Sequence, residues 1–95
     1  MDYGYAEYAQ MFKALSDETR LRIIMMLTEE ELCACKILEA FKITQPTLSY
    51  HMKILMQCGI VIGKRKGAWM FYHLNQERIH QLQRFLDLKI DCQEG

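Results

Sequence analysis

Two cysteines separated by one residue, Cys33 and Cys35, are the side chains of this sequence best suited to chemistry. Thiolate sulfur is a soft ligand that selects As(III), Sb(III), Cd(II), Pb(II), Zn(II) or Cu(I) over ions that prefer oxygen. The acidic Asp2 and Glu7 near the start are unlike a signal peptide, so we expect a cytoplasmic protein with reduced thiols. The pair is therefore predicted to capture a thiophilic metalloid or metal ion, with no cofactor permanently bound.

The spacing of the pair sets a geometric constraint. On a regular helix the two side chains would point about 200° apart, because each residue turns the helix by about 100°. We therefore expect the helix start to be irregular or to unwind when one ion binds both sulfurs, which would move the neighbouring helix. Cys58 and Cys92 are further candidate ligands, although burial as small apolar side chains is the favoured interpretation of both.

The charges are segregated along the chain. Twelve basic and twelve acidic residues cancel overall, but no Asp or Glu occurs from Ala40 to Gln76. Such a tract suits phosphate binding, because each Lys or Arg near a duplex releases counterions whereas carboxylates would repel the backbone. The alternative is a solvated basic face. The basic residues of this acid-free tract are Lys42, Lys53, Lys64, Arg65 and Lys66.

Apolar periodicity predicts five helices, over residues 5–15, 17–27, from the cysteine pair to about 42, 45–58 and 76 to about 90. β-branched and aromatic content predicts strands at 60–62 and 69–74, joined by a basic turn over 63–68 whose glycines mark a bend. The residues suited to cap these helices are Ser16 or Asp17, Thr44 and Asn75. The predicted fold is mainly α with one β-hairpin, in a single domain of residues 1–95, and no apolar run is long enough to cross a membrane.

The third and fourth predicted helices, joined by a tight turn, form a helix-turn-helix, and the basic hairpin adds a wing. Hydroxyl, amide and imidazole groups near the start of the fourth helix can contact bases and phosphates. The alternative is a purely structural helix pair. We predict double-stranded DNA as the partner. The expected contacts are Thr44, Gln45, Thr47, Ser49, Tyr50, His51, Lys53, Lys64, Arg65 and Lys66.

Three stretches of the sequence resemble the arsenical-resistance repressor (ArsR/SmtB) family of winged-helix regulators. They are residues 12–23 (FKALSDETRLRI), 31–35 (ELCAC) and 45–53 (QPTLSYHMK), and the resemblance extends through the wing. It implies a homodimeric repressor that binds an inverted-repeat operator and uses ELCAC as its metal-binding box. One departure is Ile37, where arsenic-responsive members with three clustered thiols carry a cysteine. The third ligand therefore stays unidentified.

The resemblance also implies that the first and last helices, residues 1–15 and 76–91, form the dimer interface. Both helices carry apolar residues at helical spacing, although such stripes often pack within one protomer. His80 lacks the Asp-x-His companion of the family's last-helix zinc sites, so no metal is expected there. The predicted interface residues are Tyr8, Met11, Phe12, Leu15, Ile79, Leu82, Phe85 and Leu86.

An enzyme is not expected, because the sequence lacks a nucleophile–base set, a phosphate-binding glycine loop and paired carboxylates. Two other functions stay open. In the first, a repressor of the same fold senses thiol oxidation or persulfide, although the cysteines of such relatives do not align with Cys33 and Cys35. In the second, the winged helix has lost its DNA affinity and binds another protein through its apolar first helix.

Overall fold

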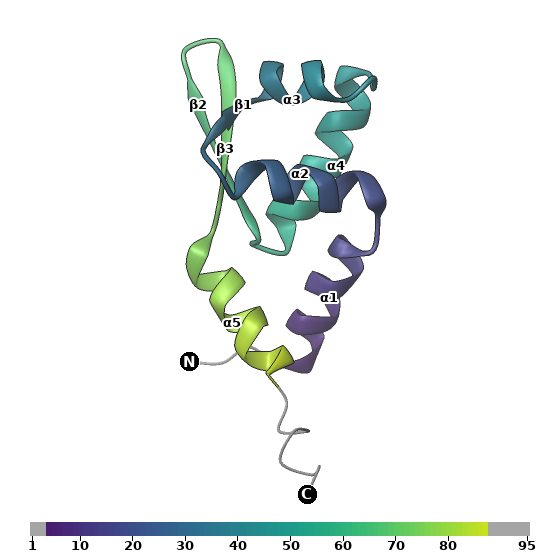
Figure 1. Cartoon of the computed structure of the whole chain (residues 1–95), viewed down its shortest axis with the longest axis vertical. Helices are drawn as coiled ribbons and strands as arrows, with labels where there is room; N and C mark the ends of the chain where they lie inside the picture. The colour runs from purple at the N-terminus through teal and green to yellow at the C-terminus, as the bar shows by residue number, and fades with distance from the viewer. Residues whose placement is uncertain (1–3, 88–95) are drawn as a thin grey trace, which may run out of the picture.

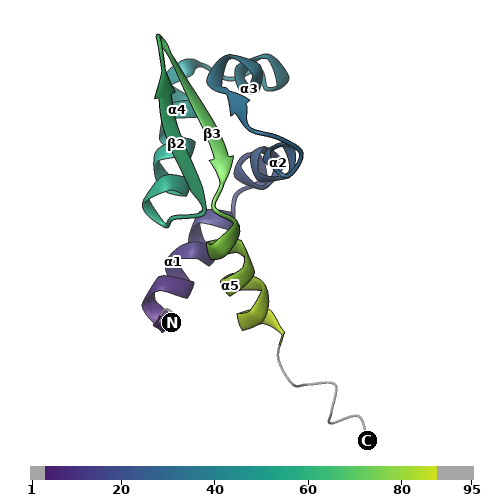
Figure 2. The same ribbon diagram turned by 90° about the vertical axis from the view of Figure 1, so that its left-hand side faces the viewer.

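The computed structural model describes residues 4–87, and Figures 1 and 2 show how its elements are arranged. The elements follow the predicted order with one strand added, which confirms the mainly helical fold with a hairpin. None of the helices in this part of the chain combines the length and apolar character that crossing a bilayer requires. The elements are α1 (Tyr5–Leu15), α2 (Glu18–Leu27), β1 (Leu32–Cys33), α3 (Ala34–Ala40), α4 (Gln45–Gln57), β2 (Val61–Lys66), β3 (Trp69–Leu74) and α5 (Gln76–Leu86).

Side-chain caps begin three of the helices at the predicted residues. Asp17, Thr44 and Asn75 each accept a hydrogen bond from the backbone N–H three residues later, at 3.0, 3.3 and 3.3 Å. These bonds satisfy donors that the first helical turn leaves without an intrahelical partner. Past the end of α4, Gly59 has a φ of +83°, in the left-handed region that stops a helix.

The turn of the hairpin is shorter than predicted. β2 continues through most of the expected loop, and only Gly67 and Ala68 connect it to β3. Gly67 has a φ of +66°, which favours glycine. Gly63 serves packing instead, because a Cβ there would lie 2.8 Å from the Met56 Sδ. The two glycines that indicated one loop therefore have separate roles.

A strand that was not predicted, β1, completes the sheet. Leu32 and Cys33 pair antiparallel with Tyr72 and Phe71, which gives the strand order β1-β3-β2. Two residues are too few to show the alternation that marks a strand in sequence. β1 forms because β3 offers its second edge to it.

α3 and α5 both end earlier than predicted. α3 stops at Ala40, because Phe41 is extended at φ −120° and ψ 140° and places its ring in the core. α5 stops at Leu86. The rest of the predicted last helix, 88–91, and Cys92 lie outside the described residues.

The helix-turn-helix and the wing occupy one end of the molecule, and α1 and α5 form the other (Figures 1 and 2). A core of apolar side chains runs between the two ends, and its burial is the main source of stability. Its most deeply buried members are Met11, Ile23, Ile37, Met52, Leu55, Ile60 and Val61.

Part of the predicted dimer interface lies inside a single protomer. Tyr8, Met11 and Leu82 are 6%, 0% and 6% exposed, so they are buried within one protomer, and their contact with a second copy stays a prediction. The Tyr8 ring stacks on Phe85 with 4.2 Å between centroids and joins α1 to α5. These apolar stripes are therefore used at least partly to pack the two helices against each other.

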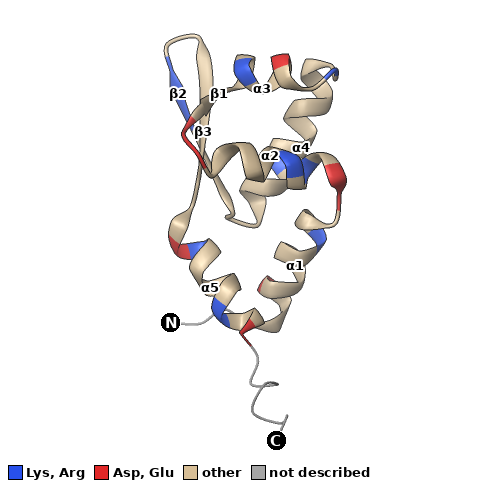
Figure 3. Ribbon diagram, in the orientation of Figure 1, with Lys and Arg blue, Asp and Glu red and all other residues tan. Residues whose placement is uncertain are grey.

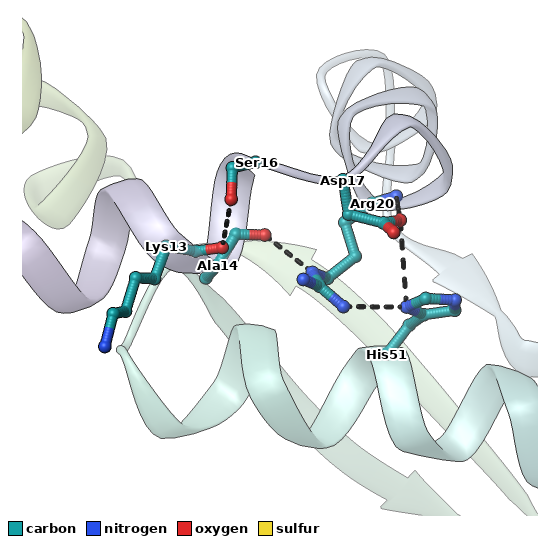
Figure 4. A network of polar contacts seen from close by, with 6 residues as sticks. All are labelled: Lys13, Ala14, Ser16, Asp17, Arg20 and His51. Atoms are coloured by element: carbon teal, nitrogen blue, oxygen red, sulfur yellow. Dashed lines mark hydrogen bonds and ion pairs between the residues drawn. The ribbon is translucent and has the colours of Figure 1, made fainter.

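A buried arginine ties α2 to its neighbours (Figure 4). Arg20 is 9% exposed, and its Nε donates to the Ala14 carbonyl at 2.6 Å. Its Nη1 lies 3.0 Å from His51 Nδ1, which must accept the bond because arginine only donates. Asp17 lies 3.9 Å from the same ring nitrogen, and the Arg20 backbone N–H holds the pKa of that carboxyl below its usual value. The network joins the end of α1, the start of α2 and the middle of α4.

We expect Tyr8→Ala to lower the free energy of unfolding by about 3 kcal/mol, because the change removes a buried ring and its stack on Phe85. Tyr5 is a matched control, since it lies on the same helix but is 85% exposed. Tyr5→Ala should change the unfolding free energy by less than about 0.5 kcal/mol. Denaturant unfolding measures both values, and equal losses would contradict the interior position of Tyr8.

Replacing Arg20 by Met should lower the free energy of unfolding by about 2 kcal/mol, because the buried Ala14 carbonyl and His51 Nδ1 both lose their donor. The control is Arg84→Met on the exposed side of α5, with an expected effect within about 0.5 kcal/mol. A stability of Arg20→Met matching that of the control would mean that the network in Figure 4 contributes little.

Candidate nucleic-acid interface and thiol pair

The predicted DNA contacts on the fourth helix lie on the outer side of α4, with one exception. Leu48, Met52 and Leu55 turn toward the core and are buried. The opposite side is polar and open to solvent, with Tyr50 60% exposed. Figure 3 shows no acidic residue on α4 or on the hairpin. The exposed predicted contacts here are Thr44, Gln45, Thr47, Ser49, Tyr50 and Lys53.

His51 is the exception. Its side chain is 12% exposed and points inward, with Nδ1 against Arg20 and Asp17 (Figure 4). The ring is already engaged in holding α4 against α2. The structure therefore gives no support to His51 as a DNA contact.

The wing carries its basic residues on β2. Lys64, Arg65 and Lys66 are all exposed, as a phosphate-contacting wing requires. Lys66 is also engaged within the protein, since its Nζ lies 3.0 Å from Glu31 Oε1 and 4.9 Å from the centre of the Phe71 ring. The hydrogen bond from Lys66 holds the pKa of the Glu31 carboxyl below its usual value. Glu31 thereby ties the segment that precedes the cysteines to the wing.

The two cysteines lie on either side of a helix start. Cys33 ends β1 and is the extended N-cap of α3, whereas Cys35 lies in the first turn of α3. Their Cα atoms are 5.2 Å apart, and the two sulfurs are joined as a disulfide. The Cys35 N–H also donates to Cys33 Sγ at 3.2 Å. Cys33 is buried and Cys35 is half-buried, so the pair is approached from the side of Cys35.

This arrangement corrects the geometric expectation in one respect. The separation of about 200° applies only when both residues are helical. Because Cys33 is extended, α3 keeps its regular form while the two sulfurs meet. Bringing the sulfurs together therefore requires no unwinding of α3. The expected movement of the neighbouring helix no longer follows from the spacing of the two cysteines.

The described residues supply no third ligand. Within residues 4–87, no group of three His, Cys, Asp or Glu side chains lies close enough to hold one ion. Cys58 is 2% exposed, donates to the Leu55 carbonyl at 3.4 Å, and has its pKa raised by burial. It is a small buried side chain, as the favoured interpretation expected. Cys92 lies outside the described residues.

Sequence reasoning missed several residues that shape the site. Glu31 and Arg20 act through partners that are distant in sequence, and only folding brings those partners near. Trp69 and Tyr72 were assigned to a strand but not to a surface. They line a hollow between α4 and the wing, which also reaches Ala34 between the two cysteines.

Comparison with known proteins agrees with this geometry. The family model described as bacterial regulatory protein, arsR family, matches residues 17–62. An arsenical resistance operon repressor of Staphylococcus xylosus is 42% identical over 92 residues, which are 97% of this chain and 88% of that protein. An uncharacterised helix-turn-helix transcriptional regulator of Methanocaldococcus jannaschii is 39% identical over 84 residues, covering 87% of this chain and 94% of that protein.

A solved structure with the same fold comes from Mycobacterium bovis. It is the homodimeric winged helix-turn-helix DNA-binding domain of a possible ArsR-family regulator, with a TM-score of 0.74 and 26% identity over 90% of this chain and 80% of that one. The sequence matches and the winged helix-turn-helix geometry together show that this chain belongs to the arsR family of bacterial regulatory proteins, and is a transcriptional regulator rather than an enzyme.

Proposed function

We propose that this regulator is a homodimeric repressor that binds an inverted-repeat operator through α4 and the wing, and leaves it when Cys33 and Cys35 capture a thiophilic inducer, most readily As(III). The observation that carries the proposal is the position of the thiol pair. It lies at the start of the first helix of the helix-turn-helix and pairs with the middle strand of the wing sheet. Inducer site and DNA-reading elements thus belong to one continuous structure.

The DNA-binding part is supported by the chemistry of one surface. The outer side of α4 carries hydroxyl and amide groups, and a major groove is wide enough to admit an α-helix. The wing carries exposed cations beside this helix. The acid-free tract contains no carboxylate that would repel a phosphate backbone.

A homodimer would explain the apolar surface that α1 and α5 leave uncovered. Tyr5 and Leu86 are 85% and 56% exposed, and Phe12, Leu15, Ile79 and Phe85 are half-buried in one protomer. The Mycobacterium bovis domain is homodimeric. A twofold axis through this end of the molecule would present two α4 helices to successive major grooves of an inverted repeat.

The choice of inducer is supported by sulfur chemistry and by the names of relatives. Reduced Cys33 and Cys35 offer two soft donors at one point, which suits As(III) and Sb(III), with Cd(II), Pb(II), Zn(II) and Cu(I) as other ions of that preference. The Staphylococcus xylosus relative is an arsenical resistance operon repressor. A third donor would have to come from outside the described residues of one chain, from a second protomer or from the solution.

The route from the thiols to the DNA-reading surface is short. Cys33 pairs with Phe71 in the sheet, and Glu31 bonds Lys66 on the neighbouring strand. A change in the position of Cys33 would therefore alter the positions of both strands of the wing. This route replaces the unwinding of α3 that the sequence alone suggested.

For the DNA surface, we expect Lys64→Ala combined with Arg65→Ala to weaken binding to all duplexes and to make the salt dependence shallower by about two counterions. Thr47→Ala or Tyr50→Ala should instead change which sequences are selected from a random duplex pool, because these side chains lie where base edges would be. Lys13→Ala combined with Arg84→Ala removes the same charge from the far end of the molecule.

The control variant, Lys13→Ala combined with Arg84→Ala, should leave the salt dependence of binding and the selected sequences unchanged. Titration of the selected duplex should also reach saturation at two chains per inverted repeat. Identical selected sequences for all four variants would overturn the division between a reading helix and a wing that contacts phosphate.

For the inducer site, Cys33→Ser combined with Cys35→Ser should bind the duplex as tightly as the unaltered protein but stay bound when arsenite is added. The experiment is run with a phosphine reductant, so that both thiols of the unaltered protein are free. Cys58→Ala is the matched control, since it removes a buried thiol and should still release. Arsenite bound per chain, measured by thiol counting, gives a second readout. Release of the double variant would contradict the assignment of the site.

The disulfide between Cys33 and Cys35 favours one other function, a repressor that senses oxidation. Two thiols would lose two protons and two electrons to a peroxide, which is reduced to two water molecules. Adding hydrogen peroxide without reductant to the same complex distinguishes the two. Release by peroxide but not by arsenite would favour oxidation sensing, and the reverse favours the inducer proposed above.

A further inference from the structure

The outward side of α2 carries large apolar side chains that the rest of the described chain leaves open. Leu21 is 47% exposed and Met25 is 65% exposed. Two hollows, of about 290 Å³ and about 490 Å³, lie along this side of the helix, and both are lined by Met25 and Met26. They form one continuous groove, which we call the α2 groove.

The α2 groove combines projecting side chains with recesses. Its first hollow lies between α2 and the end of α3 and reaches the buried ring of Phe41. Its second hollow lies between the end of α2 and β1, and it reaches Leu32. A surface that holds both projections and recesses can interlock with another such surface, as packed helices do.

Opposite charges mark the two ends of the α2 groove. Arg22 lines the first hollow, with its guanidinium carbon 5.0 Å from the centre of the Phe41 ring. Glu29 and Glu30 line the second hollow. These three charged side chains are exposed, and none of them forms an ion pair within residues 4–87. Their charges are therefore available to a partner.

The position of the groove separates it from the surfaces already described. Its lining comes from α2, the end of α3 and the segment that leads into β1. Figure 1 shows α2 crossing the molecule above α1 and α5, and Figure 2 shows it on the side away from β2. A partner in this groove would thus contact a part of the chain that the proposed function leaves unused.

The pattern of the groove is complementary to its own reversal. Arg22 lies three residues before Met25, and Glu29 lies four residues after it. If a second α2 runs antiparallel about a twofold axis at Met25, its Glu29 comes within one residue of Arg22, or about 1.5 Å along the helix. By symmetry its Arg22 meets Glu29 of the first copy. A partner of a single charge would match only one end of the groove.

We propose that a second copy of this chain docks in the α2 groove, with the two α2 helices antiparallel and the Met25 side chains packed between them. The apolar contact supplies the affinity, because exposed ion pairs contribute little, and the charges fix the antiparallel direction. The contact is separate from α1 and α5, so it would join one homodimer to another. A contact centred on one helix of 10 residues is expected to bury less than the about 1,200 Å² of a stable complex, so it forms at high protein concentration.

The first test measures the average mass by sedimentation equilibrium, from micromolar to millimolar protein. Met25→Lys places like charges at the twofold axis and should weaken the concentration-dependent association at least about tenfold. Ile62→Lys is the matched control, because Ile62 is an exposed apolar residue on β2, outside the groove, and should leave the association unchanged. The proposal is overturned if Met25→Lys associates as the unaltered protein does at every concentration.

The second test exchanges the charges at the two ends of the groove. Arg22→Glu alone should associate less than the unaltered protein, and so should Glu29→Lys combined with Glu30→Lys, because like charges then face each other. An equimolar mixture of these two variants should associate more strongly than either variant alone, and added salt should weaken the mixed association. If the mixture associates no more than its components, the groove does not join two copies of this chain.

Folding of the variants and binding to DNA are checked separately. All the replaced side chains are exposed, so the variants should fold normally, and far-ultraviolet circular dichroism confirms this. Met25→Lys should bind the selected duplex with unchanged affinity at micromolar concentration, because Met25 lies outside α4 and the wing. Failure of the unaltered protein to bind any duplex would contradict the proposed function, whereas the mass measurements decide the α2 contact whatever the result with DNA.

Discussion

The pairing of β3 on both of its edges is the constraint on which the rest of the site depends. On one edge β3 forms the hairpin with β2, and on the other it holds β1. Tyr72 and Leu74 on β3 are buried in the core, so the strand cannot shift without disturbing the interior. The wing, the thiol pair and the core thus share one strand.

This shared strand places the thiol pair and the wing in one small sheet. Cys33 is a member of the sheet, and Glu31 beside it bonds the basic strand of the wing. The hollow between α4 and the wing also reaches Ala34, which lies between the cysteines. Only a few contacts therefore separate the thiol pair from the wing. The other end of the molecule, with α1 and α5, is joined to α4 through the Arg20 network.

Much of the fold could be predicted because its signals are local. Caps at Asp17, Thr44 and Asn75 depend on a hydrogen bond to a residue three positions later, so the residue type alone indicates them. Other side chains are positioned by partners that are distant in sequence. His51 was predicted to contact DNA because its helix has the pattern of a recognition helix, but its ring points inward and accepts a hydrogen bond from Arg20. Tyr8 was assigned to a dimer because its stripe is apolar, but Phe85, far along the chain, stacks on it.

The sequence by itself determined the order of the elements, the acid-free tract, the outward side of α4 and the Cys-x-Cys pair. These follow from residue type and short-range spacing, which the chain carries whether or not it is folded. Only the tertiary structure decided that Cys33 is extended and meets Cys35 without unwinding α3, and that Gly63 packs inside a strand. It also decided that Trp69 and Tyr72 face α4 across a hollow. The physical reason is that β1 has no strand character of its own and forms only where β3 presents a free edge.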